Sequence, residues 1–301
     1  MSNDDSTWTY YHYDPSLPAA LIFTILFGIS SVVHTIQMLR TRTWCFIPYV
    51  IGGYCEQYAV HIPTNSLITL KVECVGYIGR ALGHYETPNW TLGPYVLQSL
   101  LILVAPALFA ASIYMVLGRL ILITKHPEYA IVKPRWLTRF FVSGDVISFL
   151  VQAAGAGIMV TGANGMRTGE DVVIAGLFIQ IAFFGLFIVT ATVFLWRMQR
   201  NQSAARLTIP GLPWRKNLLV MYAACLLIMA RSVFRVIEYI QGNNGYLLRH
   251  EVFLYIFDGV LMFMQMLLYN MCHPSELISI GKTAILPNGQ SSSVRLRPFF
   301  V

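Results

Sequence analysis

The chain is 301 residues long; 56% of these residues are hydrophobic and only 12% carry a charge. A soluble chain would carry about twice that share of charged residues, because about 25% is usual. The formal net charge is +7, but the basic residues are sorted between particular loops, and this pattern argues against a nucleic-acid-binding surface. We therefore expect an integral membrane protein with no nucleic-acid partner.

Seven apolar segments follow one another along the chain, and a helix needs roughly 20 such residues to cross the hydrocarbon core. Three segments have that length without a charged residue: Leu17–Leu39, Leu92–Leu117 and Val172–Trp196. Two contain one acid each, Asp145 in Phe140–Gly165 and Asp258 in Val252–Cys272. Asn217–Tyr239 is apolar in its first half and charged in its second, and the remaining segment begins at Trp44. The sequence predicts an all-α, polytopic membrane protein with seven transmembrane helices.

Positive charge is concentrated in alternate connections between these segments. The first, third and fifth connections and the C-terminal tail carry Arg40, Arg42, Arg119, Lys125, Lys133, Arg135, Arg139, Arg197, Arg200, Arg206, Arg215, Lys216, Lys282, Arg295 and Arg297. The other connections carry only Arg167 and Arg249. The positive-inside rule then predicts an extracellular tail at residues 1–16, a transmembrane domain at 17–272 and a cytosolic tail at 273–301. Asn89, in an Asn-Trp-Thr sequon on the outer side, is a glycosylation candidate.

The segment from Trp44 to Leu82 is too long for one span. Its 39 residues would form a helix of about 58 Å, nearly twice the hydrocarbon thickness of about 30 Å. Removal of 17 residues, either Glu56–Val72 or Gln57–Glu73, leaves one helix of ordinary length. We hypothesise an insertion around residues 56–73, with an in-frame retained intron as one origin; the alternative is an irregular or re-entrant segment.

Polar residues inside the spans are costly in lipid and usually face a bundle interior or a cavity. Arg231, Arg235 and Glu238 stand at i, i+4 and i+7 and so share one helical face. On other spans, polar residues likewise stand in pairs seven residues apart, which is the spacing from Arg231 to Glu238. The candidate substrate or cavity residues are Glu56, Glu73, Arg80, Gln98, Asp145, Gln152, Gln180, Arg231, Arg235, Glu238, Asp258 and Gln265. The set favours a shared polar cavity.

The structural alternative for each charge is a buried ion pair that holds the bundle together, for example Arg231 or Arg235 with Asp145 or Asp258. Gly155 and Gly157 would permit close helix contact. The sequence contains no Walker motif, no Gly-rich dinucleotide fingerprint and no His-rich metal cluster. We therefore expect that the protein binds no metal and no cofactor and that it is not an enzyme.

As an ordered set across the spans, several short motifs resemble those of the fungal RTA-like family, also called lipid-translocating exporters. They are Pro15-Ser16, Gly52-Gly53 with a following Glu, Gly76-Tyr77, Arg80, Pro94-Tyr95, Gln98, Pro106-Ala107, Ala110-Ala111, Tyr114, Asp145, Ser148, Gln152, Gly155, Gly176, Gln180, Arg231, Arg235, Glu238, Gly242, Gly245, Glu251, Tyr255 and Asp258. The chain departs from the family pattern at the 17-residue interruption, which leaves open whether Glu56 or Glu73 fills the Glu position.

The resemblance implies a plasma-membrane exporter of sphingoid bases and other toxic amphiphiles, with membrane lipids and amphipathic small molecules as its partners. In that function the acidic residues would bind an amine head group, and the arginines would compensate them or bind phosphate. The competing hypothesis is a seven-helix sensor or receptor for lipids without transport activity, since seven spans with an outer N-terminus also match receptor topology.

Overall fold

The computed structural model describes residues 17–57, 92–124, 126–159, 163–200, 214–241, 247 and 251–274. Within these ranges the chain is almost entirely helical and contains no strand. Five helices are long and apolar enough to cross a membrane: α1 (Leu17–Thr41), α4 (Leu92–Ile123), α5 (Pro134–Met159), α6 (Ala163–Arg200) and α8 (Trp214–Gln241). A 3-10 turn at Trp44–Phe46 leads into the shorter α2 (Ile47–Gln57). The last helix consists of α9 (Glu251–Leu254), a π-helical segment (Tyr255–Val260) and α10 (Leu261–Met271). The predicted all-α fold with seven helices is confirmed for the described part of the chain.

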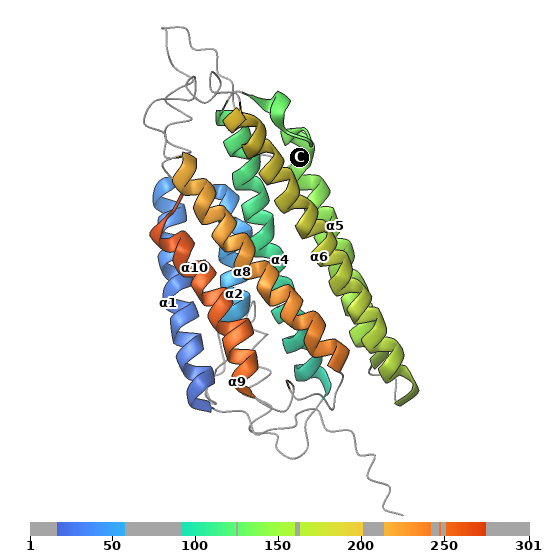
Figure 1. The fold of residues 1–301 in the computed structure, drawn as a ribbon. Coiled ribbons are helices and arrows are strands. Elements are labelled where there is room, and N and C mark those ends of the chain that lie inside the picture. Colours follow the sequence, from blue (N-terminus) through green and yellow to red (C-terminus); the bar gives the residue numbers. More distant parts are fainter. Residues whose placement is uncertain are drawn as a thin grey trace, which may run out of the picture.

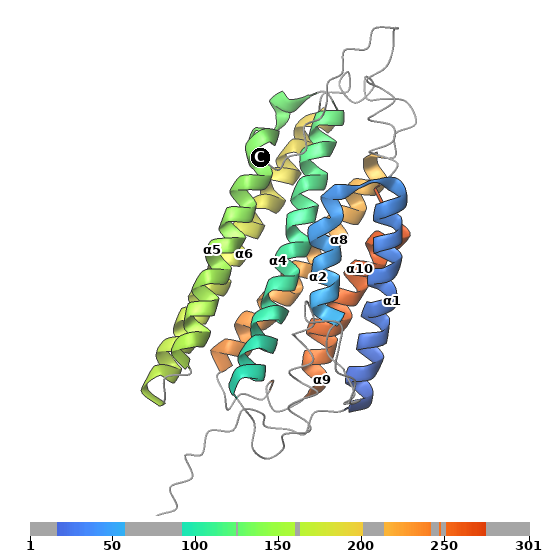
Figure 2. The ribbon, with the colours of Figure 1, turned by 180° about the vertical axis from the view of Figure 1, so that it is seen from behind.

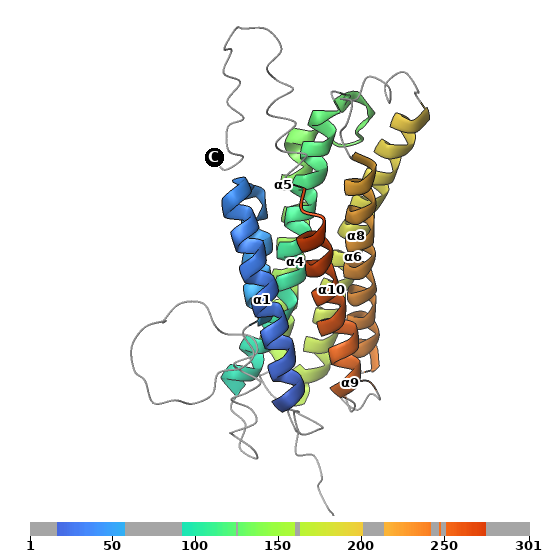
Figure 3. The same ribbon diagram turned by 90° about the vertical axis from the view of Figure 1, so that its left-hand side faces the viewer.

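Successive helices run in alternating directions (Figures 1 and 2), and their contacts form a ring. Each helix packs against the next along the chain, and α10 packs against both α8 and α1, which closes the ring. The closing side, where α1 and α10 come together, faces the viewer in Figure 3. α4 also touches α8 across the ring. The start of α1 and the end of α10 lie at opposite ends of the bundle, as an odd number of spans requires (Figure 1).

The outer surface of the ring is apolar. Leu219, Leu226 and Ile29 expose 73%, 69% and 61% of their surface, and Leu150 on α5 exposes 59%. In water such a surface would be an association site, whereas acyl chains cover it without cost. The exposed leucines and isoleucines therefore face the bilayer, and this accounts for the high hydrophobic content of the chain.

Small residues bring α5 and α6 into close contact. A Cβ atom added to Gly155 would lie 2.7 Å from Val173 Cγ2, and one added to Gly176 would lie 2.6 Å from Gln152 Cγ. Gly157 differs, because nothing lies within 4 Å of its position. The sequence prediction of close contact therefore holds at Gly155 and is wrong at Gly157, which lies on the exposed side of the same helix.

The family-like Gly52-Gly53 pair in α2 has a similar packing role, with each glycine facing a different neighbour. A Cβ atom at Gly52 would lie 3.0 Å from the Phe109 ring on α4. At Gly53 it would lie 2.6 Å from Met266 Cε on α10 and 2.7 Å from Ser31 Oγ on α1. The two glycines thus allow α2 to lie between three helices.

The interrupted second span ends at Gln57 in the described structure. Its 11 helical residues reach about 16 Å, short of the roughly 30 Å hydrocarbon core. Residues 58–91, which hold most of the hypothesised insertion together with Glu73, Arg80 and Asn89, lie outside the described residues. The insertion therefore stays a hypothesis. The boundary between α5 and α6 also differs from the predicted segments Phe140–Gly165 and Val172–Trp196. α5 ends at Met159 and α6 begins at Ala163, so Arg167, Glu170 and Asp171 belong to the first turns of α6.

Candidate functional site: charged and polar residues inside the bundle

Four charged side chains of α8 and the last helix meet inside the bundle, and we call them the charged cluster: Arg231, Arg235, Glu238 and Asp258. Arg231 forms an ion pair through its Nε atom with Oδ1 of Asp258, across the interface between α8 and the π-helical segment. Further along α8, Nη1 of Arg235 donates a hydrogen bond to Oε2 of Glu238 over 2.7 Å. Asp258 also interacts electrostatically with Arg235. All four residues expose 6% or less of their surface.

The sequence explains why these groups meet. Arg231, Arg235 and Glu238 lie on one face of α8, as the spacing indicates, and that face is turned to the last helix. There the backbone forms a π-helical turn, a feature that is frequent at functional sites. Beside the pair, the rings of Phe234 and Phe257 stack at a centroid distance of 4.6 Å. This stacking fixes the two helices against each other next to the charges.

The charged cluster is electrically balanced, since two guanidinium groups face two carboxylates. Balance matters in a membrane, because an unpaired charge at this depth is expensive. A buried pair adds little net stability, but removal of one partner leaves the other uncompensated. The charged cluster therefore makes the packing of α8 against the last helix depend on all four side chains being present.

Asp145 lies apart from this cluster, on α5. It exposes only 4% of its surface, and its carboxylate oxygens have no basic hydrogen-bond partner among the described residues. The hydroxyl of Tyr114 on α4 faces the carboxyl group and interacts with it. The Tyr114 ring in turn contacts Phe187 at 4.5 Å and Phe141 at 5.5 Å between centroids. Asp145 is thus a buried acid beside aromatic rings, without a basic partner in the described part of the chain.

Two predicted glutamines join α5 to α6. The Nε2 atom of Gln152 donates to Ser148 Oγ over 2.7 Å and to Gln180 Oε1 over 3.3 Å. Ser148 passes the contact on, since its hydroxyl donates to the backbone oxygen of Gly176 over 2.7 Å. These bonds cross the glycine-rich interface described above. Gln152 and Gln180 therefore clasp the two helices and supply the polar contact that apolar membrane helices otherwise lack.

A third polar group, at the junction of α1 and α10, contains residues that the sequence analysis did not single out. Nδ1 of His34 donates to Asn270 Oδ1 over 2.5 Å, and Asn270 Nδ2 donates to Ser30 Oγ over 2.6 Å. Gln37 Nε2 donates to the Asn270 backbone oxygen over 2.9 Å. His34 and Asn270 are 236 positions apart, so no local spacing could reveal the contact. A polar residue in an apolar run was the only available signal.

The remaining predicted residues are placed as follows. Gln265 is fully buried on α10, and its backbone oxygen accepts a bond from the Tyr49 hydroxyl over 3.0 Å. Glu56 lies at the end of α2 and Gln98 in the first turns of α4, but the positions of both side chains are outside the described structure. In the described ranges, no three His, Cys, Asp or Glu residues gather as a metal site would require.

The fold and these interior charges define a polytopic helical membrane protein with ionisable groups inside its bundle. The chain belongs to the family described as RTA1 like protein, whose model matches residues 66–280. It is 36% identical over 293 residues to Protein RTM1 of Saccharomyces cerevisiae, covering 89% of this chain and 93% of that protein. The protoporphyrin uptake protein 1 of the same species is 35% identical over 292 residues, covering 90% and 93% of the two chains. The sphingoid long-chain base transporter RSB1 is 25% identical over 304 residues, covering 90% and 75%.

No solved structure matches the chain. The relatives named as transporter and uptake protein place it among membrane proteins associated with transport, without defining its substrate.

Proposed function

We propose that this protein is an exporter that translocates amphipathic molecules bearing a cationic amine, such as sphingoid bases, across a fungal plasma membrane. Sterol-like and other toxic amphiphiles with the same charge pattern belong to the proposed substrate class. The N-terminal tail at residues 1–16 is outside, the transmembrane domain is residues 17–272, and the tail at 273–301 is cytosolic. The protein acts as a transporter and not as an enzyme.

The observation that carries this proposal is the isolated carboxyl group of Asp145. The four members of the charged cluster compensate one another, whereas Asp145 has no basic partner within the described residues. A carboxylate inside a membrane protein gains greatly from a neighbouring cation. An amine head group is such a cation, and it would form a charge-assisted hydrogen bond with the carboxylate.

The surroundings of Asp145 suit an amine in a second way. The ring of Tyr114, whose hydroxyl faces the acid, packs with the rings of Phe141 and Phe187, and the faces of aromatic rings attract ammonium groups. The substrate's apolar chain would lie against the leucine- and isoleucine-rich outer faces of the helices, where it remains in contact with acyl chains. An amphiphile could therefore keep its chain in lipid while its head group enters the bundle.

Substitution of Asp145 tests the assignment. Asp145→Asn keeps the shape of the side chain but removes the charge, and the loss of one charge-assisted hydrogen bond of about 1.5–3 kcal/mol predicts export about 10 to 100 times slower. The matched control is Asp171→Asn, because Asp171 is exposed in the first turns of α6. Export of a labelled sphingoid base from cells, at equal surface expression, should fall in the first variant only. Unchanged export with Asp145→Asn would refute the role of this residue.

A further inference from the structure

One end of the bundle carries a strong excess of positive charge. The ends of α1, α4 and α6 and the starts of α5 and α8 meet there (Figure 1). Their basic side chains, with those of the adjoining turns, are Arg40, Arg42, Arg119, Lys133, Arg135, Arg139, Arg197, Arg200 and Lys216. Among the acidic residues that the structure describes, only Glu128 lies at this end. Trp44, Trp136 and Trp196 expose 54–58% of their surface there, as tryptophans at the level of lipid head groups do.

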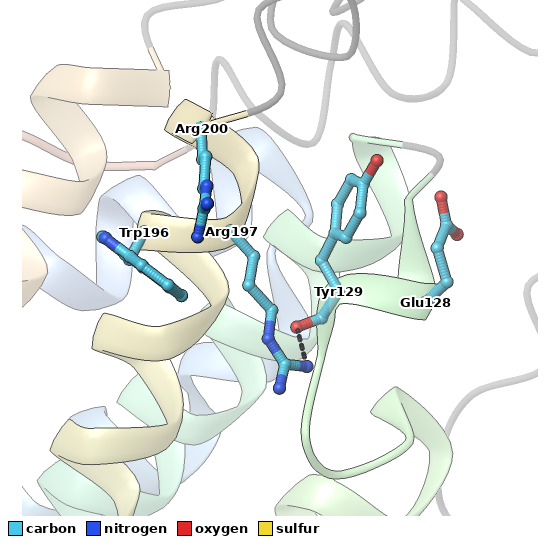
Figure 4. Close-up of a pocket in the computed structure, with 5 residues that line it drawn as sticks. All are labelled: Glu128, Tyr129, Trp196, Arg197 and Arg200. Atoms are coloured by element: carbon cyan, nitrogen blue, oxygen red, sulfur yellow. Dashed lines mark hydrogen bonds between the residues drawn. The ribbon is translucent and has the colours of Figure 1, made fainter.

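A pocket of about 510 Å³ opens at this end, between the last turn of α6 and the short 3-10 turn η2 (Pro127–Tyr129) that precedes α5. We call it the head-group pocket. It is lined by Glu128, Tyr129, Trp196, Arg197 and Arg200 (Figure 4). Its volume falls within the range of about 300–1,000 Å³ that is typical of small-molecule sites.

The two arginines of the head-group pocket are held in place by their neighbours. Nη1 of Arg197 donates to the backbone oxygen of Tyr129 over 3.3 Å, and this bond links α6 to η2 (Figure 4). The guanidinium carbon of Arg200 lies 5.4 Å from the centroid of the Trp196 ring. A guanidinium has five N–H donors, and each of these contacts leaves most of them for a ligand. Positioned arginines with unused donors are the typical binding partners of phosphate oxygens.

Glu128 does not neutralise this pair of arginines. Its Oε1 atom accepts a hydrogen bond from Nδ1 of His126 over 2.7 Å, and this bond holds the pKa of the Glu128 carboxyl below its ordinary value. In Figure 4 the carboxyl group lies on the far side of Tyr129 from Arg197. The side of the head-group pocket formed by α6 is therefore cationic.

We infer that the head-group pocket binds the phosphate of an anionic phospholipid from the leaflet on this side of the membrane. A lipid is favoured over a soluble phosphate by position, because the exposed Trp196 on the pocket wall places the site at the membrane interface. An anionic leaflet also raises the local concentration of such head groups around a basic protein surface. The bound lipid would join η2 to the end of α6 and so stabilise the packing of α5 against α6. This site is separate from Asp145 and does not depend on the proposed transport function.

The inference is tested with the full-length protein in phosphatidylcholine nanodiscs that contain increasing fractions of fluorescent phosphatidic acid. The variant Arg197→Gln/Arg200→Gln removes both pocket charges. The control Arg135→Gln/Arg139→Gln removes the same number of exposed charges at the same end, including an arginine that also lies over a tryptophan. We expect apparent affinity for phosphatidic acid to fall about tenfold or more in the pocket variant and about threefold or less in the control, because only the former loses directed hydrogen bonds.

Equal losses in the two variants would overturn the inference, since they would mean general attraction to a basic surface. Competition by glycerol 3-phosphate or inorganic phosphate at concentrations comparable with the lipid would assign the head-group pocket to a soluble phosphate instead, and would overturn the lipid assignment. Should the double variant fail to fold, Arg200→Gln alone removes one pocket charge and leaves the hydrogen bond from Arg197 to the Tyr129 backbone oxygen in place. It is expected to weaken binding measurably, and unchanged affinity would again overturn the inference.

Discussion

The ion pair of Arg231 and Asp258 gives the sharpest prediction about stability. The two side chains expose only 3% and 1% of their surface, so the pair is fully desolvated and should behave as a buried pair, not as a surface one. Arg231→Gln should lower the free energy of unfolding by about 3–5 kcal/mol, because it leaves the Asp258 carboxylate without its main partner. We expect the lower part of that range, since Arg235 also interacts with Asp258 and compensates part of the lost charge.

The double variant Arg231→Gln/Asp258→Asn removes both charges and keeps two polar groups of similar shape that can bond to each other. It should therefore be more stable than the sum of the two single variants predicts, by about 1–3 kcal/mol of coupling. Unfolding by sodium dodecyl sulfate in mixed micelles, followed by the loss of helical circular dichroism, measures all four proteins. Purely additive single losses would refute the reasoning, because they would show that the two side chains do not stabilise each other.

Three further predictions concern packing and the second span. Gly155→Ala should destabilise the protein by about 1–3 kcal/mol because its Cβ atom would meet the backbone of α6, whereas Gly157→Ala, with open space around it, should be neutral or slightly stabilising; thermal unfolding of both variants compares them. Asn270→Leu should lower the melting temperature, because it leaves His34 and its other partners unsatisfied, with a loss of about 1–3 kcal/mol; an unchanged melting temperature would contradict the importance of this polar junction. Sequencing of the transcript across the second span should show some messages without the 17 codons, and deletion of Gln57–Glu73 should raise the yield of folded protein; a transcript population that always encodes the segment would end the intron hypothesis.

Much of the fold could be predicted from hydropathy alone, because a helix that crosses lipid needs a long apolar run and leaves little room for other structures. The common face of Arg231, Arg235 and Glu238 could be predicted from their spacing, because a helix brings residues i, i+4 and i+7 to one side. The acid that pairs with these arginines could not be predicted. The sequence allowed either Asp145 or Asp258 to pair with an arginine, and the choice depends on which helices are neighbours. The structure places the last helix against α8, so Asp258 is paired and Asp145 is left beside aromatic rings.

The residues that sequence reasoning missed are those whose importance comes from distant contacts. The rings of His34 and His273 lie 5.4 Å apart at the junction of α1 with the end of α10, and no spacing in the sequence indicates this contact. The π-helical turn at Tyr255–Val260 also had no visible signal, because its residues fit an ordinary apolar helix equally well. The outward position of Gly157 was likewise unpredictable from the residue type, since it depends on where α6 crosses α5.

Translocation in a defined system tests the central claim most directly. The purified full-length protein is reconstituted into liposomes, and the movement of a labelled sphingoid base between leaflets is followed with and without a proton gradient. We expect faster movement than in empty liposomes, and a rate close to that of empty liposomes for Asp145→Asn at equal incorporation. A wild-type protein that binds the sphingoid base but moves none of it under either condition would contradict the proposal and favour a lipid sensor.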